Sequence, residues 1–504
     1  MIDNLVLGFS TALTPENLLW CFVGVLLGTI IGILPGLGSA TGVAILIPVT
    51  LTFEPVTALI MLAGIYHGSQ FGATITAVLI ATPGESSSVV TTLDGYQMAR
   101  KGRAGPALAL SAISSFIGSV ISIIVLMAVA PVFAHAALRF GPPEMVAVMI
   151  LGLSTIVVFS GKNIKVGIAM CLVGILLACV GVDVGSGTAR YTFGSIQLLG
   201  GIPFVEVMIG LFALGEVFDQ LHQGTLEPIR ARFKDLIFTK TDVRRSIPAV
   251  SRGTVVGFLL GCLPGAGTTL SSFMAYGTEK SFSKYRHEMG TGAIEGVVAP
   301  DAATAAGSNA NFIPTLTLGV PGGATTAVML GAFLVYGIQP GPLLFESQPA
   351  LVWGLLASFM IGSFMLLVLN LPLAPVFAQM LRLQYGYMYP LIIVVAILGA
   401  YTVSGNMFSV WVVLIFGVVG YVMKRVKLPM APLVLGLVIG PLFEKALAQT
   451  TAMGAGDPMV FFGRPIAVAI FIFTLALIIA PIVLRRRAAR KATRKAEKEL
   501  LHMN

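Results

Sequence analysis

The sequence predicts an all-α polytopic membrane protein with two inverted-topology repeats and re-entrant or broken helices, in roughly 11–14 membrane segments. Three observations support this fold class. Only 11% of the 504 residues are charged, whereas a soluble domain carries roughly 25%. The mean hydropathy is +0.93. Several motifs also recur in the same order in the two halves of the chain. The low charge content excludes an ordinary soluble enzyme.

The positions of the charges indicate a membrane topology rather than nucleic-acid binding. The formal net charge is +9, but 8 of the 31 basic residues lie in the segment 485–498 and 7 lie between positions 230 and 252. Cytoplasmic loops of membrane proteins carry the excess of Lys and Arg. We therefore expect both basic segments, and with them the C-terminus, on the cytoplasmic side. The first basic residue of the chain is Arg100, so we expect an uncleaved, periplasmic N-terminus.

Charge-free windows predict the membrane helices, because a bilayer core about 30 Å thick needs roughly 20 apolar residues per helix. The expected helices are 17–35, 107–134, 143–160, 163–181, 203–221, 350–378, 387–403, 406–424, 430–447 and 463–484. Windows 38–81 and 253–337 are also apolar, but Gly, Pro, Ser, Thr and Asn interrupt them. We expect broken or re-entrant helices in these two windows.

The same windows divide the chain into two membrane units. The expected boundaries are a first repeat at 1–225, a basic cytoplasmic linker at 226–252, a second repeat at 253–450, an extra transmembrane helix within 451–484 and a basic cytoplasmic tail at 485–504. The four Cys lie inside apolar runs without metal-ligand spacing, so we expect them to be packing residues.

Six short motifs recur in the same order in the two halves. The clearest pair is GILPGLGSA at 32–40 and GCLPGAGTT at 261–269, which are 229 positions apart. Later in each half, the Pro83-Gly84 pair has its counterpart in Pro321-Gly322. Matches that keep their order over a whole half indicate an internal repeat.

The charges that follow the matched motifs indicate that the repeats are inverted. The loop after Gly95 carries Arg100, Lys101 and Arg103, whereas the loop after its counterpart Gly337 carries Glu346 and no basic residue. Equivalent loops therefore prefer opposite sides of the membrane, as an inverted-topology repeat requires.

The repeated Pro-Gly motifs are the candidate substrate site. In inverted-repeat transporters, broken helices of both repeats meet near the membrane midplane and direct their N-terminal amides at anionic groups. Pro removes a helix donor and Gly permits close backbone approach. The predicted substrate-binding residues are Pro35, Gly36, Gly38, Ser39, Thr41, Pro83, Gly84, Ser86, Pro264, Gly265, Gly267, Thr268, Thr269, Pro321, Gly322 and Thr325. Close helix packing and simple loop turns are the alternative explanations.

A lack of charges around these motifs predicts coupling to a cation. Windows 17–53, 55–84, 253–278 and 302–345 contain no Lys, Arg, Asp or Glu, so they offer no permanent cation for a polyanion. A co-transported cation, Na⁺ or H⁺, must then neutralise an anionic substrate. Asp301 is the ionisable residue expected to face the interior, with an interfacial cap as its alternative role. The predicted cation-binding residues are Ser69, Gln70, Asp301, Thr304, Ser308, Asn309 and Asn311.

The sequence contains no pattern of a known enzyme site. His-Glu-x-x-His, Gly-x-Ser-x-Gly and the phosphate-binding Gly-x-x-x-x-Gly-Lys-Ser/Thr loop are all absent. We therefore expect no enzymatic activity, no catalytic residue, no transition-metal site and no cofactor besides the coupling ion. His67 is interpreted as a packed side chain, with a proton relay as the alternative.

The motifs resemble those of one family. The stretches GILPGLGSATGVAILIP, YHGSQFGATITAVLIATPGE, LDGYQMARKGRAGPAL and TLGVPGG are similar to the large membrane subunit (TctA type) of the tripartite tricarboxylate transporters. The resemblance covers essentially the whole chain, including the repeat and the basic central loop.

The resemblance implies a function and a set of partners. It implies a symporter of the bacterial inner membrane that imports citrate-like carboxylates, driven by an ion gradient that is commonly Na⁺. Its implied partners are a small membrane subunit and a periplasmic substrate-binding protein. The Pro35-Gly36, Pro83-Gly84, Pro264-Gly265 and Pro321-Gly322 motifs are its implied site elements. A passive anion channel and a carboxylate transporter without a binding protein remain as alternatives.

Overall fold

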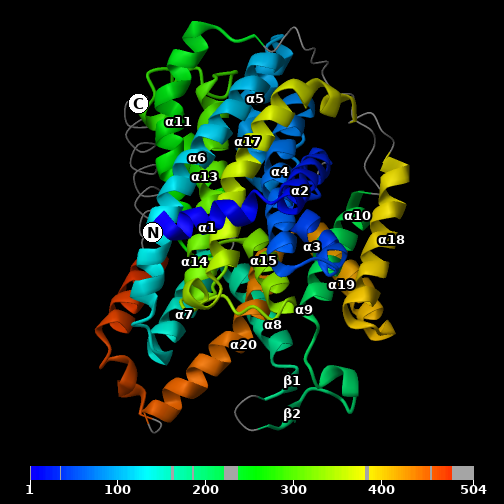
Figure 1. Cartoon of the computed structure of the whole chain (residues 1–504), viewed down its shortest axis with the longest axis vertical. Helices are drawn as coiled ribbons and strands as arrows, with labels where there is room; N and C mark the ends of the chain where they lie inside the picture. The colour runs from blue at the N-terminus through cyan, green and yellow to red at the C-terminus, as the bar shows by residue number, and fades with distance from the viewer. Residues whose placement is uncertain are drawn as a thin grey trace, which may run out of the picture.

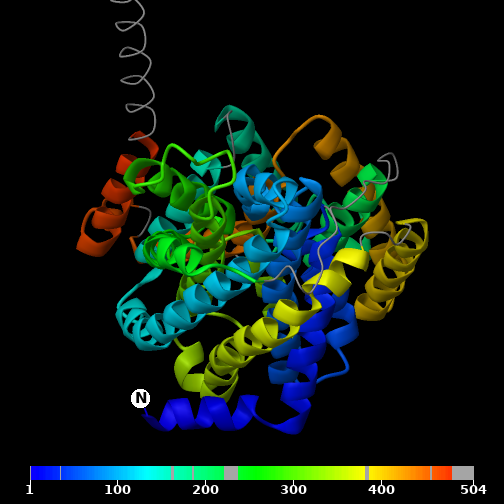
Figure 2. The same cartoon turned by 90° about the horizontal axis from the view of Figure 1, so that it is seen from above.

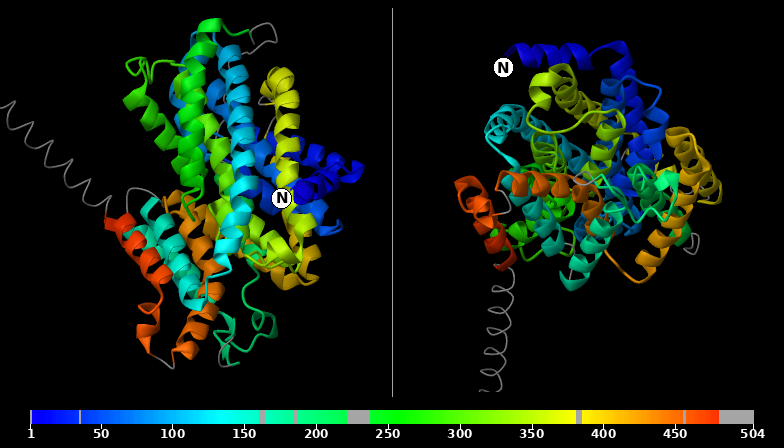
Figure 3. Two further views of the ribbon diagram at one scale, coloured as in Figure 1. Left: turned by 60° about the vertical axis from the view of Figure 1, so that its left-hand side comes forward. Right: turned by 90° about the horizontal axis from the view of Figure 1, so that it is seen from below.

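The computed structural model describes residues 2–34, 36–159, 164–183, 187–220, 237–380, 385–454 and 457–479. These residues form an elongated bundle of helices, in which β1 (Gly181–Val182) and β2 (Ala189–Arg190) pair as a short antiparallel hairpin (Figure 1). Helices α5 (Val89–Arg100) and α11 (Lys240–Gly261) reach one end of the bundle, and the β1–β2 hairpin projects from the opposite end (Figure 3). We call these the α5/α11 end and the hairpin end.

Helices account for most of the first half of the chain. Besides α5, its α-helices are α1 (Ile2–Ala12), α2 (Pro15–Ile33), α3 (Gly38–Thr50), α4 (Pro55–Ile80), α6 (Ala104–Ala137), α7 (Pro142–Phe159), α8 (Ile164–Ala178), α9 (Phe204–Met208) and α10 (Gly215–Gln220). Short segments of other helix types are the 3₁₀ turns η1 (Ser86–Ser88) and η2 (Ile196–Leu198) and the π-helix η3 (Ile209–Leu214).

The second half is also helical. Besides α11, its α-helices are α12 (Gly267–Phe282), α13 (Glu295–Ala310), α14 (Phe312–Leu318), α15 (Ala324–Val335), α16 (Leu344–Ser347), α17 (Pro349–Met380), α18 (Tyr385–Ser404), α19 (Met407–Arg425) and α20 (Met430–Met453). A 3₁₀ turn, η5 (Pro458–Phe461), and an apolar helix, Pro465–Ile479, follow them.

The predicted all-α class is confirmed, and each predicted helix has a counterpart in the structure. Among the described residues, five helices are long and apolar enough to cross a membrane: Pro15–Ile33, Ala104–Ala137, Pro349–Leu373, Met407–Arg425 and Met430–Met453. Window 38–81 holds α3 and α4 with a break between them, and α4 itself continues unbroken for 26 residues. Positions 240–252 of the predicted linker lie in the first part of α11.

The GILPGLGSA and GCLPGAGTT motifs break the chain at matching places. The first lies between α2 and α3, and the second lies between α11 and α12. Gly36 and Gly38 have φ angles of 83° and 61°, and their counterparts Gly265 and Gly267 have 77° and 66°. Residues with a Cβ avoid this left-handed region. The two halves therefore share the same local backbone at their first break.

Glycines bring the same pair of helices together in each half. A Cβ at Gly28 of α2 would lie 2.4 Å from the Ile65 carbonyl oxygen of α4, and one at Gly257 of α11 would lie 2.3 Å from the Ala303 carbonyl oxygen of α13. Gly24 and Gly32 on α2, and Gly253 and Gly261 on α11, make equally close approaches one turn away. Small residues at four-residue spacing let helix backbones touch in membranes. The contact glycines of α2 and α11 are 229 positions apart, which supports the internal repeat. The inversion of the repeat stays a prediction.

The halves are interleaved rather than separate. Helix α13 of the second half packs against α4, α5 and α6 of the first half. At the edge of the bundle, α1 lies along α17, so the first helix of the chain contacts the second half (Figure 2). Side chains of both halves therefore meet in the interior.

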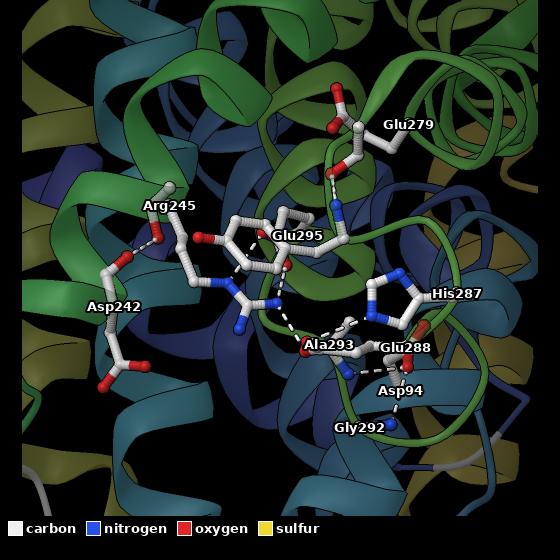
Figure 4. A network of polar contacts seen from close by, with 12 residues as sticks. Asp94, Asp242, Arg245, Glu279, His287, Glu288, Gly292, Ala293 and Glu295 are labelled. Carbon is white, nitrogen blue, oxygen red and sulfur yellow. Dashed lines mark hydrogen bonds and ion pairs between the residues drawn. The ribbon is translucent and has the colours of Figure 1, made fainter.

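Ionised side chains gather at the α5/α11 end in a network that we call the charged cap. Its members are Asp94, Arg103, Asp242, Arg245, Arg252, Glu279, Glu288 and Glu295. Arg245 donates to Glu288 and Glu295 at 2.8 Å (Figure 4). Arg252 donates to the buried Glu279 at 2.6 Å, and Arg103 donates to Asp242 at 2.6 Å. Each of these charges except Asp94 has an opposite charge in contact.

Asp94 ties the two halves together within this cap. Its buried carboxylate accepts the backbone N–H groups of Gly290, Gly292 and Ala293, each at 2.8 to 2.9 Å. The Tyr276 hydroxyl donates to it as well, at 2.9 Å. A buried carboxylate with this many donors is fully satisfied, so the contact is structural.

Candidate functional site

The first helix breaks of both halves open into one cavity of about 380 Å³, which we call the central cavity. Four chain segments that begin helices line it: 36–41 before and in α3, 83–86 with Val89 at the start of α5, 267–269 of α12, and 323–325 before and in α15. The first N–H groups of a helix lack intrahelical partners, and its dipole makes this end partly positive. Four positive helix ends, two from each half, therefore surround one space.

Close backbone contact shapes the first-half wall. A Cβ at Gly84 would lie only 2.2 Å from the Gly32 carbonyl oxygen and 2.8 Å from the Ala73 Cα. Gly84 therefore permits the turn before α5 to press against the end of α2. Because of this contact, the start of α5 lies beside the start of α3 at the cavity.

Backbone hydrogen bonds shape the second-half wall. Gly265 N–H donates to the Pro321 carbonyl at 3.2 Å, and Gly267 N–H donates to the Gly322 carbonyl at 3.0 Å. A Cβ at Gly322 would lie 2.7 Å from the Asn311 Cα, so glycine is required there too. The two Pro-Gly breaks of this half thus hold each other in place.

A chain of hydroxyl groups crosses the cavity from one half to the other. Ser39 at the start of α3 donates to Glu85 Oε1 at 2.9 Å, and its Oγ lies 2.7 Å from the Thr325 Oγ1 at the start of α15. On the α4 side, Asn311 Nδ2 donates to the Tyr66 hydroxyl at 3.3 Å. The Asn311 Oδ1 has no hydrogen-bond partner in the described parts of the chain.

The structure brings most of the predicted substrate residues together. Those that line the central cavity are Gly36, Gly38, Ser39, Thr41, Pro83, Gly84, Ser86, Gly267, Thr268, Thr269 and Thr325. Pro264, Gly265, Pro321 and Gly322 are not among its lining residues, but they form the break behind the second-half wall. Pro35 lies outside the described residues.

Charged residues at the cavity were missed from the sequence. Lys424 at the end of α19 lines the cavity, as do Glu216 of α10 and Glu85. Lys424 forms an ion pair with Glu216 and lies 3.9 Å from Asp219. The expectation that the site has no cation is therefore wrong. Charge-free windows could not reveal Lys424, because it comes from a helix end distant in sequence.

A second, smaller polar space of about 40 Å³ surrounds Asp301, and we call it the Asp301 pocket. Asp301 of α13 is 4% exposed. Its Oδ1 accepts from the hydroxyls of Thr91 at 2.8 Å and Thr74 at 3.4 Å, and its Oδ2 accepts from the Ser111 hydroxyl at 2.5 Å. The three donors belong to α5, α4 and α6 of the first half. Asp301 is thus a buried carboxylate between the halves rather than an interfacial cap.

The structure divides the predicted cation residues between different surroundings. Gln70, Asp301 and Thr304 line the Asp301 pocket, whereas Asn311 lines the central cavity. Asn309 donates to the hydroxyls of Ser119 and Ser122, and the Ser308 hydroxyl lies 3.5 Å from His67 Nδ1. The Ser69 hydroxyl is buried without a partner in the described chain. Ser69, Ser308 and Asn309 therefore line neither space.

The arrangement suits binding of an oxyanion. The central cavity combines positive helix ends, hydroxyl groups and one lysine, which are groups that hold carboxylates. Within the described residues, no cluster of three or more His, Cys, Asp or Glu side chains suits a metal ion.

Comparison with known proteins agrees with the geometry. A sequence model described as "Tripartite tricarboxylate transporter TctA family" matches residues 18–435. The chain belongs to this family. It is therefore a tripartite tricarboxylate transporter subunit and a multi-pass membrane protein. The matched residues include both helix-break motifs of each half, so all residues that line the central cavity lie within the matched range.

Two relatives come from Agrobacterium vitis. The "Uncharacterized 52.8 kDa protein in TAR-I ttuC' 3'region" is 45% identical over 491 residues, which cover 97% of this chain and 98% of the relative. The "Uncharacterized protein in TAR-II ttuC' 3'region" is 43% identical over 234 residues, or 46% of this chain and 97% of that relative. No solved structure matches the chain.

Proposed function

We propose that the chain is a cation-coupled secondary transporter subunit that imports tricarboxylates or related carboxylates, such as citrate, through the central cavity. The observation that supports this proposal is the convergence of four helix N-termini, two from each half, on one cavity. Negative groups are stabilised at helix N-termini. A substrate with several carboxylates gains from several such ends at once, and Lys424, which pairs with Glu216, lies at the same wall.

The Asp301 pocket is the proposed site of a coupling cation, Na⁺ or H⁺. Hard cations bind carboxylate, amide and hydroxyl oxygens, and the pocket offers Asp301 with Thr74, Thr304 and the side chain of Gln70. Its groups come from both halves, so an ion bound here would link them. Movement of one half relative to the other around the central cavity would then depend on the ion.

The subunit is proposed to act with a small membrane subunit and a periplasmic substrate-binding protein in the bacterial inner membrane. We place the α5/α11 end at the cytoplasm, because α5 ends at Arg100, Lys101 and Arg103 follow it, and Arg103 pairs with Asp242 of α11. The hairpin end then faces the periplasm, where a binding protein delivers substrate.

Uptake into proteoliposomes tests the proposal. The complex, reconstituted with its two partners, should accumulate radiolabelled citrate or another carboxylate in a saturable manner when an inward Na⁺ or H⁺ gradient is imposed. Gly265→Leu, which forces a side chain onto a left-handed glycine, should abolish uptake. Gly277→Ala on the exposed face of α12, where a Cβ meets no neighbour, is the control. Gradient-independent flux would refute coupling, and non-saturable flux would indicate a channel instead.

The cation site has its own test. Asp301→Asn keeps the size of the side chain and removes its charge, so carboxylate uptake should lose its dependence on the coupling cation. Ser363→Ala, which changes another residue of the same pocket without removing a charge, is the control. Unchanged cation dependence in Asp301→Asn would refute this site while leaving the substrate cavity in place.

A further inference from the structure

Glu85 projects a carboxylate into the central cavity at the N-terminus of α3. Its Oε1 accepts the Ser39 hydroxyl at 2.9 Å, and the Ser39 backbone amide faces the same carboxylate. A carboxylate at this point occupies the positive helix end that an anionic substrate would also use. The side chain therefore stands where a substrate carboxylate is expected to bind.

The second oxygen of this carboxylate has no partner. Glu85 Oε2 is buried and makes no hydrogen bond to any described residue. A buried polar atom without a partner is costly and is commonly satisfied by water, an ion or a ligand. The orphan oxygen therefore has a free coordination position at the cavity wall.

Glu85 also distinguishes the two halves. Its counterpart in the second half is Gly323, and both residues have the same backbone arrangement. Glu85 N–H donates to the Ser88 hydroxyl at 3.5 Å, and Gly323 N–H donates to the Thr326 hydroxyl at 2.8 Å. The repeated backbone turn is thus complete without a carboxylate, so Glu85 adds a charge that this turn does not need.

The charges at the cavity wall do not balance. Glu216 of α10 and Lys424 of α19 pair with each other, Tyr66 of α4 is a neutral phenol, and the walls from α3, α12 and α15 bring hydroxyl and backbone groups. Glu85 is the charged group of the described cavity wall that has no counter-ion. A bound carboxylate would compete with it for the same helix ends and repel it, since a sphere of 380 Å³ has a radius of only about 4.5 Å.

We propose that Glu85 takes up one monovalent cation, H⁺ or Na⁺, for each substrate carried through the central cavity. The cation neutralises Glu85 at its free oxygen, so the helix N-termini become available to the substrate carboxylate. Glu85 is then a second coupling group, separate from Asp301 and in the same cavity as the substrate. This inference rests on the proposed transport function.

The test counts coupling cations in proteoliposomes that hold the reconstituted complex, with the membrane potential clamped at zero by K⁺ and valinomycin. Each co-transported cation multiplies the final accumulation ratio of the substrate by the cation's own gradient. With a tenfold gradient of the coupling cation, Glu85→Gln should lower the accumulation of labelled citrate tenfold relative to wild type. Citrate exchange across the membrane, which needs no net coupling, should persist. Separate Na⁺ and pH gradients identify the ion.

Three results separate the possible failures. If wild-type complex shows no gradient-driven carboxylate uptake, the proposed function itself fails. If wild type accumulates citrate and Glu85→Gln reaches the same plateau, the assignment of Glu85 is overturned. If Glu85→Gln does not elute as a folded protein in gel filtration, Glu85→Asp replaces it. That variant should keep the wild-type plateau with a several-fold weaker apparent cation affinity, and unchanged affinity would overturn the assignment. The exposed Glu346→Gln variant is the control.

Discussion

The charged cap and the central cavity are both rich in polar groups, but these groups have partners in the cap and partly lack them at the cavity. In the cap, Arg245 contacts two carboxylates at 2.8 Å and Asp94 accepts three backbone N–H groups. At the cavity, helix N-termini face an open space, and Asn311 Oδ1 and Glu85 Oε2 lack partners among the described residues. Paired polar groups stabilise a fold, whereas unpaired ones remain available for a ligand. This difference predicts that cap substitutions reduce stability and cavity substitutions reduce transport.

The largest expected effect is at a backbone contact of the cavity wall. Gly84→Ala places a Cβ 2.2 Å from the Gly32 carbonyl oxygen, and neither backbone can move freely. We expect the turn before α5 to shift and carboxylate uptake to fall by more than about 100-fold, because misplacing a binding group by about 1 Å costs that much. Uptake by proteoliposomes measures the loss. Gly277→Ala is the matched control, and equal uptake by both variants would contradict the assigned contact.

Arg245→Ala tests the cap side of the comparison. The substitution leaves the nearly buried Glu295 and the more exposed Glu288 without their cation. Breaking a buried pair costs at most about 3–5 kcal/mol, and the 18% exposure of the Arg245 side chain lowers this figure. The melting temperature of the purified protein should drop, while the number of cations coupled per substrate should not change. A changed number of coupled cations with an unchanged melting temperature would contradict a purely structural role of the cap.

Lys424 is expected to matter for affinity. Lys424→Met removes the cation from the cavity wall, and losing a charge-assisted hydrogen bond costs about 1.5–3 kcal/mol, or roughly 10–150-fold in affinity. The effect should be larger for a tricarboxylate than for a monocarboxylate, since the helix N-termini can still hold one carboxylate. The Lys424→Met/Glu216→Gln double variant removes the unpaired Glu216 charge as well. If the double variant binds citrate like wild type, Lys424 has only a structural role.

A smaller effect is expected from the hydroxyl chain. Thr325→Val keeps the shape of the side chain and removes its hydrogen bond to Ser39. A neutral hydrogen bond contributes about 0.5–1.5 kcal/mol, so we expect a two- to tenfold rise in the KM for citrate with little change in melting temperature. The matched control is Thr278→Val on the exposed side of α12, whose hydroxyl bonds only its own helix. An equal effect in both variants would exclude a role for the chain.

The smallest effect is a pH dependence in the cap. Burial tends to raise the pKa of Asp242, but hydrogen bonds from Arg103 and Thr239 outweigh it, so its pKa lies below the ordinary 3.8. Its stabilisation is therefore present above about pH 4 and is lost as the pH falls through the lowered pKa. Asp242→Asn should lower stability at pH 7 by about 0–1 kcal/mol, because Arg103 is exposed. At pH values below the lowered pKa the two proteins should melt alike; a constant difference would refute the linkage.

Much of the helix plan follows from local sequence. Runs without charges predict α6, α17, α19 and α20, because only apolar side chains tolerate lipid. The glycines at 36, 38, 265 and 267 predict the breaks, since few other residues adopt positive φ angles. These signals lie in a few neighbouring residues, which is why they are readable without the structure.

Long-range contacts escaped prediction. Glu85 stands inside a quoted motif, yet its role depends on Ser39 and Thr325, which lie 46 and 240 positions away. Lys424 lies at the end of a predicted membrane helix, and only the packing of α19 against α10 puts it at the cavity. Likewise, Asp301 was predicted to face the interior, but its three hydroxyl partners could not be named.

By itself, the sequence determined that this chain is an all-α membrane protein of the tricarboxylate transporter type, with repeated helix breaks at defined glycines. Hydropathy and backbone freedom are properties of single residues and short windows, so they can be read along the chain. Only the tertiary structure decided which breaks share a cavity, which carboxylates are paired and which one at the described wall of that cavity is left without a counter-ion. The lining of a cavity and the pairing of charges depend on distances between segments that are far apart in the sequence. These distances are fixed only when the two halves pack together.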